Sequence, residues 1–231
     1  MKQFLKNKYP KILRVYYKIR FYIRFFYIKQ VRHHIFWLIN NGDNKLYKNL
    51  YLKKNDLFLD VGSYKGEVIN KIRDLYDCNI IGFEPEKSNF NYLEQKFKKY
   101  KHIKIYDYGL SNFTGESYLF TDYGNSSLSL NRNNNKAGLK VKIKNISEFI
   151  REQNIKVINV LKLNVEGAEY EILNELINTG YIKNIKVLII QFHLINDFSK
   201  LHRLNIIKKL EKTHNNKFSY YFVWEKWILK E

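Results

Sequence analysis

The chain contains little of what disulfide-rich, secreted or membrane-spanning proteins need. Its 231 residues include one cysteine, Cys78. A single cysteine excludes a disulfide framework and a cysteine-based metal site, and it suits a reducing compartment such as the cytosol. The N-terminal region has no small-residue cleavage site after an apolar core, so no signal peptide is expected. We therefore expect a cytoplasmic protein, and we assign no metal ligands.

Acidic residues are absent from residues 1–42, which makes the charge of the chain uneven. The whole chain carries a formal net charge of +19. Aromatic residues are interleaved with the basic ones throughout this segment, and no uncharged run approaches the roughly 18 residues of a membrane span. The basic residues are Lys2, Lys6, Lys8, Lys11, Arg14, Lys18, Arg20, Arg24, Lys29 and Arg32.

Residues 1–45 are predicted to form a basic amphipathic helical extension, followed by a single domain at residues 46–231. On one continuous helix, five of the basic residues would share a sector and leave a wide aromatic and apolar surface. These five are Lys11, Arg14, Lys18, Lys29 and Arg32. Such a helix lies on an anionic membrane surface, which would place the protein at the inner face of a membrane. Alternatively, the apolar surface packs against the domain or against a second subunit of a homo-oligomer. RNA is a further alternative, although nucleic acid is not the expected partner.

A glycine-bearing loop follows the first apolar strand. Residues 57–59 lead into Asp60-Val61-Gly62-Ser63-Tyr64-Lys65-Gly66 and then into a helical segment. This is the arrangement of a nucleotide-binding loop at the edge of a parallel sheet. Gly62 lets the chain turn off the strand, and Gly66 lets the backbone approach a ligand. The spacing differs from G-x-G-x-x-G, so the dinucleotide fingerprint is incomplete.

An acidic residue follows the second predicted strand. The apolar residues 80–83 end at Glu84-Pro85, and Glu84 lies 24 positions after Asp60. This is close to the offset of about 20 residues at which a carboxylate binds a pair of ribose hydroxyls. Glu84 is therefore predicted to bind ribose, the alternative being a solvated carboxylate at a strand end. Pro85 is predicted to stop the strand and to start a helix that runs to about residue 100.

From residue 57 onward strands and helices alternate, which predicts one doubly wound α/β domain with a mostly parallel sheet. Strands are predicted at residues 57–59, 80–83, 103–106, 117–121, 141–144, 157–165 and 186–192, with a closing hairpin at 218–223 and 227–229. Ligands bind such sheets at the carboxyl ends of the strands. The residues that fall at predicted strand ends are Asp60, Glu84, Gly109, Asn164, Glu166 and His193.

Four segments, in this order, resemble those of the FkbM-type methyltransferases. They are Asp60-Val-Gly-Ser-Tyr-Lys-Gly, Gly82-Phe-Glu-Pro, Gly109-Leu-Ser-Asn-Phe-Thr-Gly and Lys162-Leu-Asn-Val-Glu-Gly-Ala-Glu. The resemblance covers roughly residues 55–195 and is most specific in the Val-Glu-Gly-Ala-Glu block. It implies a class I, Rossmann-like methyltransferase that uses S-adenosylmethionine to O-methylate a sugar or glycan intermediate.

The resemblance also implies roles for individual residues. Methyl transfer is an in-line displacement, so the protein aligns donor and acceptor and excludes water. A sugar hydroxyl also needs a base. His193 is the expected base, and Glu166 is the second candidate, as base or as the group that orients His193. A core histidine and a carboxylate at a helix N-terminus are the structural alternatives. The residues expected to contact S-adenosylmethionine are Asp60, Gly62, Ser63, Gly66, Glu84, Pro85, Gly109, Leu110 and Asn164.

Two positions depart from the family pattern. Asn164 stands where the family usually has aspartate, and Gln191 stands where it often has glutamate. Both changes remove a negative charge, which leaves open a catalytically silent subunit that binds the donor without turnover. An NAD(P)-dependent oxidoreductase would share Glu84, but the missing G-x-G-x-x-G counts against it. An RNA methyltransferase that uses the basic segment is the third alternative.

Overall fold

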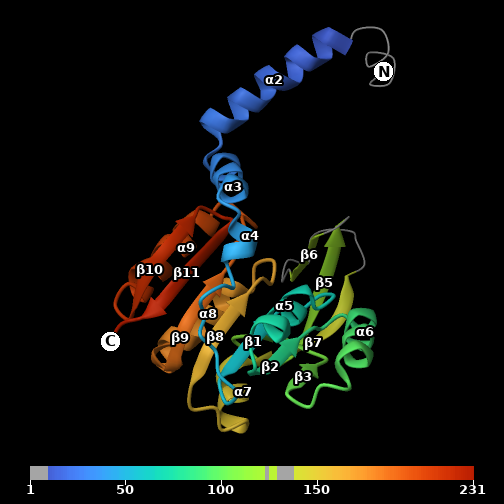
Figure 1. The fold of residues 1–231 in the computed structure, drawn as a ribbon, viewed down its shortest axis with the longest axis vertical. Coiled ribbons are helices and arrows are strands. Elements are labelled where there is room, and N and C mark those ends of the chain that lie inside the picture. The colour runs from blue at the N-terminus through green and yellow to red at the C-terminus, as the bar shows by residue number, and fades with distance from the viewer. Residues whose placement is uncertain (1–9, 123–124, 129–137) are drawn as a thin grey trace.

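The computed structural model describes residues 10–122, 125–128 and 138–231 (Figure 1). The basic residues predicted for the extension at positions 2, 6 and 8 lie outside this part of the chain. A seven-stranded sheet forms the centre of the protein, in the order β10-β11-β9-β8-β1-β2-β3. Its strands are β1 (Leu57–Val61), β2 (Asn79–Phe83), β3 (Ile103–Tyr106), β8 (Ile158–Leu163), β9 (Ile185–Ile190), β10 (His214–Tyr220) and β11 (Trp224–Leu229).

The main sheet is mostly parallel, which confirms the predicted doubly wound α/β fold. Its central strands run parallel to one another, whereas β11 pairs antiparallel with both β9 and β10. The strand order reverses beside β1, because β2 and β3 follow on one side and β8 and β9 on the other. The carboxyl ends of β1 and β8 therefore form the topological switch point, where ligands of such sheets bind.

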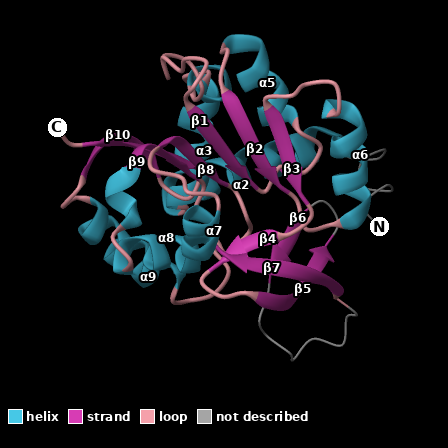
Figure 2. Cartoon of the chain, turned by 90° about the horizontal axis from the view of Figure 1, so that it is seen from below, coloured by secondary structure: helices cyan, strands magenta, loops and turns pink. Residues whose placement is uncertain are grey.

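Helices cover both faces of this sheet (Figure 2). Successive side chains of β1 point to opposite faces of the sheet, and both faces need cover because both are apolar. Phe58 packs with residues of α5 (Glu67–Leu75) and α6 (Lys87–Phe97), whereas Leu59 faces the opposite side. On that side lie α7 (Ile146–Glu152), α8 (Glu169–Asn178) and α9 (Ser199–Leu210), with the 3-10 helix η1 (Tyr181–Asn184) after α8. Both faces are apolar, as in buried parallel strands.

A second, smaller sheet lies beside the main one, with the strand order β4-β7-β5-β6 (Figure 2). Its strands are β4 (Gly109–Ser111), β5 (Gly115–Asp122), β6 (Asn125–Leu128) and β7 (Leu139–Asn145). The sequence predicts β5 and β7 but neither β4 nor β6. Both missed strands are four residues or shorter, too short for a period-2 pattern to stand out.

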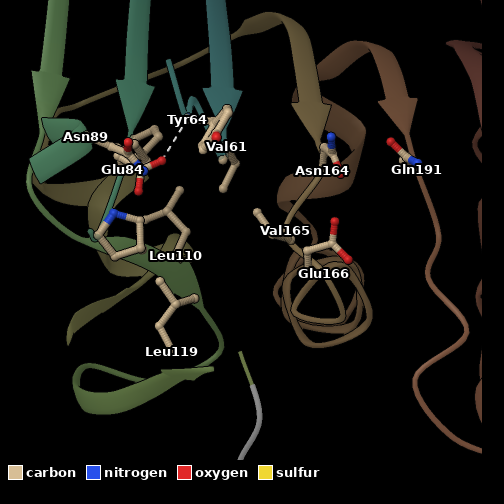
Figure 3. A pocket seen from close by; sticks show the side chains of 14 residues that line it. Val61, Tyr64, Glu84, Asn89, Leu110, Leu119, Asn164, Val165, Glu166 and Gln191 are labelled. Carbon is tan, nitrogen blue, oxygen red and sulfur yellow. Dashed lines mark hydrogen bonds between the residues drawn. The ribbon is translucent and has the colours of Figure 1, made fainter. Parts of the chain in front are cut away.

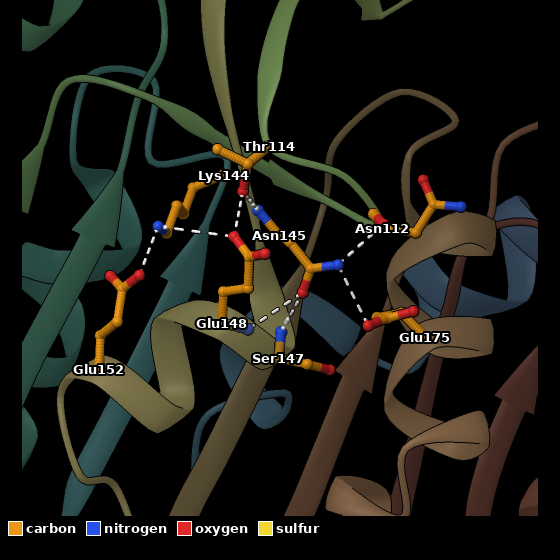
Figure 4. A network of polar contacts seen from close by, with 8 residues as sticks. All are labelled: Asn112, Thr114, Lys144, Asn145, Ser147, Glu148, Glu152 and Glu175. Atoms are coloured by element: carbon orange, nitrogen blue, oxygen red, sulfur yellow. Dashed lines mark hydrogen bonds and ion pairs between the residues drawn. The ribbon is translucent and has the colours of Figure 1, made fainter.

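Asn145, the last residue of β7, ties this small sheet to α7 and α8 (Figure 4). Its side-chain oxygen accepts hydrogen bonds from the backbone N–H groups of Ser147 (2.7 Å) and Glu148 (3.1 Å), and so caps α7. Its Nδ2 donates to the carbonyl of Asn112 at 2.8 Å and to Oε1 of Glu175 at 3.1 Å. One side chain thus joins three elements.

Replacing Asn145 with alanine should therefore lower the stability of the domain by about 2 kcal/mol, because the helix loses its cap and Glu175 loses a donor. For a domain of this size that is a fall of roughly 4–8 °C in melting temperature, measurable by circular dichroism. Asn215→Ala, at an exposed position of β10, is the matched control and should change the melting temperature little. Equal effects of the two substitutions would contradict this account.

The N-terminal segment is not the single helix that the sequence predicts. It forms α2 (Pro10–Tyr27), α3 (Lys29–Ile39) and the short α4 (Gly42–Lys45). Ile28 separates the first two helices with extended dihedral angles, φ −103 and ψ 99. The predicted sector of basic residues is consequently wrong, because Lys29 and Arg32 belong to a different helix from Lys18.

Helix α3 packs on the domain, which is the alternative to membrane binding that the sequence left open for this part of the extension. Trp37 is buried, with its ring 5.9 Å from that of Phe218 and 5.3 Å from that of Tyr220. Gln30 donates a hydrogen bond to the carbonyl of Phe222. Within the described residues, no helix is both long enough and apolar enough to cross a bilayer.

Two element boundaries also differ from the predictions. The closing hairpin turns at residues 221–223, where Phe222 has φ 53, and the predicted turn at 224–226 is part of β11. Helix α6 begins at Lys87, after Pro85. The reason is Glu86, whose carboxylate accepts the N–H groups of Ser88 and Asn89 and caps the helix.

Candidate active site

A cavity of about 380 Å³ opens at the carboxyl edge of the main sheet, beside the switch point (Figure 3). The loops after β1, β2, β8 and β9 contribute to its wall, and β4 and β5 of the small sheet close another side. The lining residues are Val61, Gly62, Tyr64, Phe83, Glu84, Pro85, Asn89, Gly109, Leu110, Leu119, Asn164, Val165, Glu166 and Gln191.

The structure brings most of the predicted site residues to this cavity. Those in its wall are Gly62, Glu84, Pro85, Gly109, Leu110, Asn164 and Glu166. Those outside its wall are Asp60, Ser63, Gly66 and His193. Figure 3 shows Glu84 and Glu166 on opposite sides of the cavity, so that a ligand in it would lie between two carboxylates.

Glu84 is held at the cavity wall by two backbone donors. Its Oε2 accepts the N–H of Tyr64 at 2.7 Å and its Oε1 accepts the N–H of Glu86 at 3.0 Å. Burial raises the pKa of Glu84 to about 7, and the two backbone hydrogen bonds limit the rise. Each oxygen keeps a lone pair, so the carboxylate can still accept both hydroxyls of a ribose.

Asn164 has an unpartnered acceptor at the switch point. Its side-chain Oδ1 is buried and has no hydrogen-bond partner within the described residues. A buried acceptor without a donor is costly, so this oxygen is suited to a ligand with an N–H or O–H group. The adjacent loop requires glycine at position 62, since a Cβ on Gly62 (φ 82) would lie 2.1 Å from the carbonyl oxygen of Asn164.

Asp60, predicted to contact the donor, instead lies beneath the loop. It is fully buried, and its Oδ1 forms an ion pair with Nζ of Lys162 at 2.8 Å, not an aligned hydrogen bond. Lys162 also donates to the carbonyl of Gly62 at 2.9 Å. The pair thus fixes the loop. Oδ2 of Asp60 is also buried without a hydrogen-bond partner within the described residues, so the contact of Asp60 with a ligand stays a prediction.

Ser63 and Gly66 also serve the loop itself. The hydroxyl of Ser63 donates to the carbonyl of Asp60 at 3.0 Å. Gly66 has φ 73, and a Cβ there would lie 2.7 Å from side-chain atoms of Leu93 and Phe97. Glycine is therefore required at this position by packing against α6, and the approach of a ligand to Gly66 stays a prediction.

His193 lies between two carboxylates. Its Nε2 is 3.3 Å from Oε1 of Glu166, and its Nδ1 is 3.1 Å from Oε1 of Glu169. Glu169 is fully buried and also accepts the backbone N–H groups of Gly167 and His193, both at 2.8 Å. Burial alone would lower the pKa of His193, but the two carboxylates outweigh it and raise the pKa to about 9.

These contacts argue against His193 as the base. A histidine with a pKa of about 9 carries its proton at neutral pH, and both of its ring nitrogens already face a carboxylate. It also lies outside the cavity wall, whereas Glu166 lies in it. Glu166 is half-buried and lies in the cavity wall, where His193 contacts it.

The raised pKa of His193 makes stability depend on pH. His193 binds its proton more tightly in the folded chain (pKa about 9) than in the unfolded one (pKa 6.5). Its contribution to the free energy of unfolding is therefore complete below pH 6.5 and is lost as the pH rises through 9. We expect about 2–3 kcal/mol to be lost, or roughly 5–10 °C in melting temperature. Melting curves of the wild type and of His193→Gln at neutral and alkaline pH measure this. Parallel declines of the two proteins would contradict it.

Several residues of the site are absent from the sequence-based prediction. Tyr64, Asn89 and Leu119 line the cavity, and Lys162 and Glu169 support its wall. Lys162 and Glu169 belong to the segment 162–169 that resembles the FkbM-type methyltransferases. That resemblance indicates that the two residues matter, but it does not indicate what they do. Their partners are backbone groups and buried charges, which only the folded chain brings together.

Comparison with known proteins gives three results. The model of the FkbM methyltransferase domain matches residues 60–220. No curated protein matches the chain significantly in sequence. A crystal structure from Clostridium thermocellum, of a protein assigned as an rRNA methylase, has a TM-score of 0.54 at 9% identity, over 83% of this chain and 96% of that one.

Two further solved structures match the chain with lower TM-scores. An rRNA methylase from Streptococcus thermophilus has a TM-score of 0.47 at 10% identity, over 84% of this chain and 95% of that one. TrmK from M. capricolum, in complex with S-adenosylhomocysteine, has a TM-score of 0.46 at 13% identity, over 81% of this chain and 67% of that one. At 9% identity, the likeness to the Clostridium thermocellum structure concerns the fold alone.

Proposed function

Because the chain belongs to the FkbM methyltransferase family and takes its methyl group from S-adenosylmethionine, we propose that it transfers this group to a hydroxyl of a sugar or glycan intermediate. The observation that carries the proposal is Glu166, a half-buried carboxylate in the wall of the cavity, opposite the carboxylate of Glu84. One side of the cavity is thus suited to the donor and the other to a reacting hydroxyl.

The residues at the cavity fit the donor. Glu84 would hold the two ribose hydroxyls, and the unpartnered Oδ1 of Asn164 would accept a hydrogen bond from the amino group of the methionine part. Pro85 and Leu110 offer apolar contacts for the adenine. When bound, S-adenosylmethionine supplies a methyl group on a positively charged sulfur.

Glu166 has the position of a general base. It would accept the proton of the acceptor hydroxyl as the new carbon–oxygen bond forms. The neighbouring His193, protonated at neutral pH, holds the carboxylate in place through the 3.3 Å contact. Glu169 in turn fixes the ring of His193 from the opposite side, at 3.1 Å.

One of the two departures from the family pattern, Gln191, supports a polyhydroxyl acceptor, whereas Asn164 is assigned to the donor. Asn164 and Gln191 both lie in the cavity wall and are neutral amides. An amide offers both donors and an acceptor, which matches hydroxyl groups that do the same. A sugar needs no further negative charge beside Glu166, so the loss of two carboxylates is compatible with turnover.

An RNA acceptor is the alternative to be tested, because the net charge of +19 would attract a polyanion. The test supplies S-adenosylmethionine with a tritiated methyl group and offers nucleotide-activated sugars, free sugars and folded RNA in parallel. Label in a sugar, stable to alkali as an ether, supports the proposal. Label in RNA overturns it. Binding of S-adenosylhomocysteine without label in any acceptor would favour a silent subunit.

A further inference from the structure

Helix α2 has an apolar face that no other part of the described chain covers. Its described members are Ile19, Tyr22, Ile23 and Tyr27, which are 54%, 58%, 54% and 85% exposed. They recur at the spacing of one helix face. In the sequence the same spacing continues upstream at positions 12, 15 and 16, which are apolar or aromatic. So much exposed apolar surface in one row is characteristic of an interaction site.

The opposite face of α2 is the one that contacts the rest of the protein. Phe25 stacks on Phe21, with ring centres 6.2 Å apart, and its ring meets that of Phe36 in α3 edge to face at 6.0 Å. Phe21 and Phe25 lie about half a turn away from Ile19 and Ile23. Packing on α3 therefore uses one side of the helix, and the exposed apolar residues lie on the other side.

Charge decides which partner fits this face. Lys18, Arg20 and Arg24 are exposed, and the chain has no acidic residue before Asp43. On the helix, Arg20 and Arg24 border the apolar face on one side and Lys18 lies toward the other. Two copies joined through this face would bring like charges together. RNA would neutralise the charges, but it would leave the side chains of Ile19 and Ile23 exposed to water. An anionic lipid surface satisfies both requirements.

Helix α2 leaves the domain at the edge that carries the cavity. The turn at 221–223 directly precedes β11, and Glu225 pairs with Ile190 at the carboxyl end of β9. This turn is therefore at the carboxyl edge. Helix α3 is fixed to the turn by the hydrogen bond from Gln30 to Phe222 and by Lys29 over the ring of Tyr221 at 4.4 Å.

A second group of exposed apolar residues lies at the same edge. Leu194, Ile195 and Phe198 are 42%, 49% and 64% exposed in the segment that follows β9. This segment begins just after Gln191, which lines the cavity, and after His193, which contacts Glu166. Exposed apolar residues thus occur both on α2 and beside the site.

We propose that α2 docks on an anionic membrane surface, with its apolar face at the level of the acyl chains, its basic residues at the headgroups and the carboxyl edge of the sheet toward the lipid. The segment at 194–198 would then be the second contact of the domain with the membrane. This inference does not depend on the identity of the acceptor. It rests on the exposed apolar face of α2, on the basic residues of that helix and on its place at the carboxyl edge of the sheet.

Sedimentation of the full-length protein with vesicles tests this proposal. Binding is expected to vesicles of phosphatidylcholine mixed with phosphatidylglycerol and not to phosphatidylcholine alone. Arg20→Gln/Arg24→Gln should weaken binding roughly 30-fold, because each basic residue at the surface contributes about fivefold. Ile19→Ser/Ile23→Ser should weaken it at least as much, since the apolar contacts are lost. The positions are exposed, so circular dichroism should show unchanged folding.

Lys54→Gln/Lys101→Gln is the matched control. It removes the same charge at exposed positions before β1 and β3, at the opposite edge of the sheet, and should leave binding unchanged. The proposal is overturned if the wild type does not sediment with anionic vesicles, or if the control weakens binding as much as the arginine pair. It is also overturned if the isoleucine pair has no effect. Self-association that requires Ile19 and Ile23, without vesicle binding, would identify a second copy as the occupant.

Discussion

Glu166→Gln is expected to lower the rate of methyl transfer by about 10²–10⁴-fold, the usual contribution of a positioned base. Glutamine keeps the shape of the side chain, and its oxygen can still accept a hydrogen bond from Nε2 of His193, 3.3 Å from Oε1 of Glu166. The affinity for S-adenosylhomocysteine should therefore stay the same. Single-turnover transfer to the labelled acceptor, together with calorimetric titration of the product, separates the two effects.

His193→Gln is the informative companion to that variant. If His193 only positions Glu166, its loss should reduce the rate less than Glu166→Gln does, and the double variant should be no slower than Glu166→Gln alone. A larger loss from His193→Gln than from Glu166→Gln would restore His193 as the base. An unchanged rate in Glu166→Gln would remove Glu166 from the chemistry altogether.

The second large effect is expected at Glu84. Glu84→Ala should weaken the binding of S-adenosylmethionine and S-adenosylhomocysteine by roughly 10- to 100-fold, because hydrogen bonds from two ribose hydroxyls to a carboxylate are lost. The N–H groups of Tyr64 and Glu86 also lose their acceptor. Calorimetric titration with both compounds measures the change.

Glu86→Gln is the control for charge and for folding near Glu84. Glu86 caps α6 from outside the cavity, and glutamine retains an acceptor for Ser88. Affinity should be unchanged. If both variants bind the donor equally well, the ribose is not held by Glu84. If Glu84→Ala fails to fold, Glu84→Gln keeps the side chain and tests the same charge.

The sequence predicts those site residues whose position follows from a strand end. Glu84 and Asn164 come directly after β2 and β8, and strand ends can be located from apolar runs, so both reach the cavity as expected. Strand alternation with helices likewise predicts the parallel sheet. These features depend on local pattern, which a sequence displays.

What the sequence does not reveal depends on neighbours that are distant in the chain. His193 is well placed for a base by its position, but its protonation follows from Glu166 and Glu169. Gly66 has the pattern of a ligand-binding glycine, yet its neighbours are Leu93 and Phe97. The N-terminal helix is interrupted at Ile28, where the sequence has no proline or glycine, and α3 beyond it packs on the last hairpin.

The near-neutral pKa of Glu84 has a consequence for how the enzyme responds to its surroundings. In its proposed role, this carboxyl group must release a proton to accept two ribose hydroxyls fully, so affinity should rise with pH near neutrality. Donor and product carry the same ribose and gain or lose affinity together. A fall in pH through this range would therefore lower the occupancy of the site by both compounds. Proton concentration would then control the enzyme in addition to the supply of the donor.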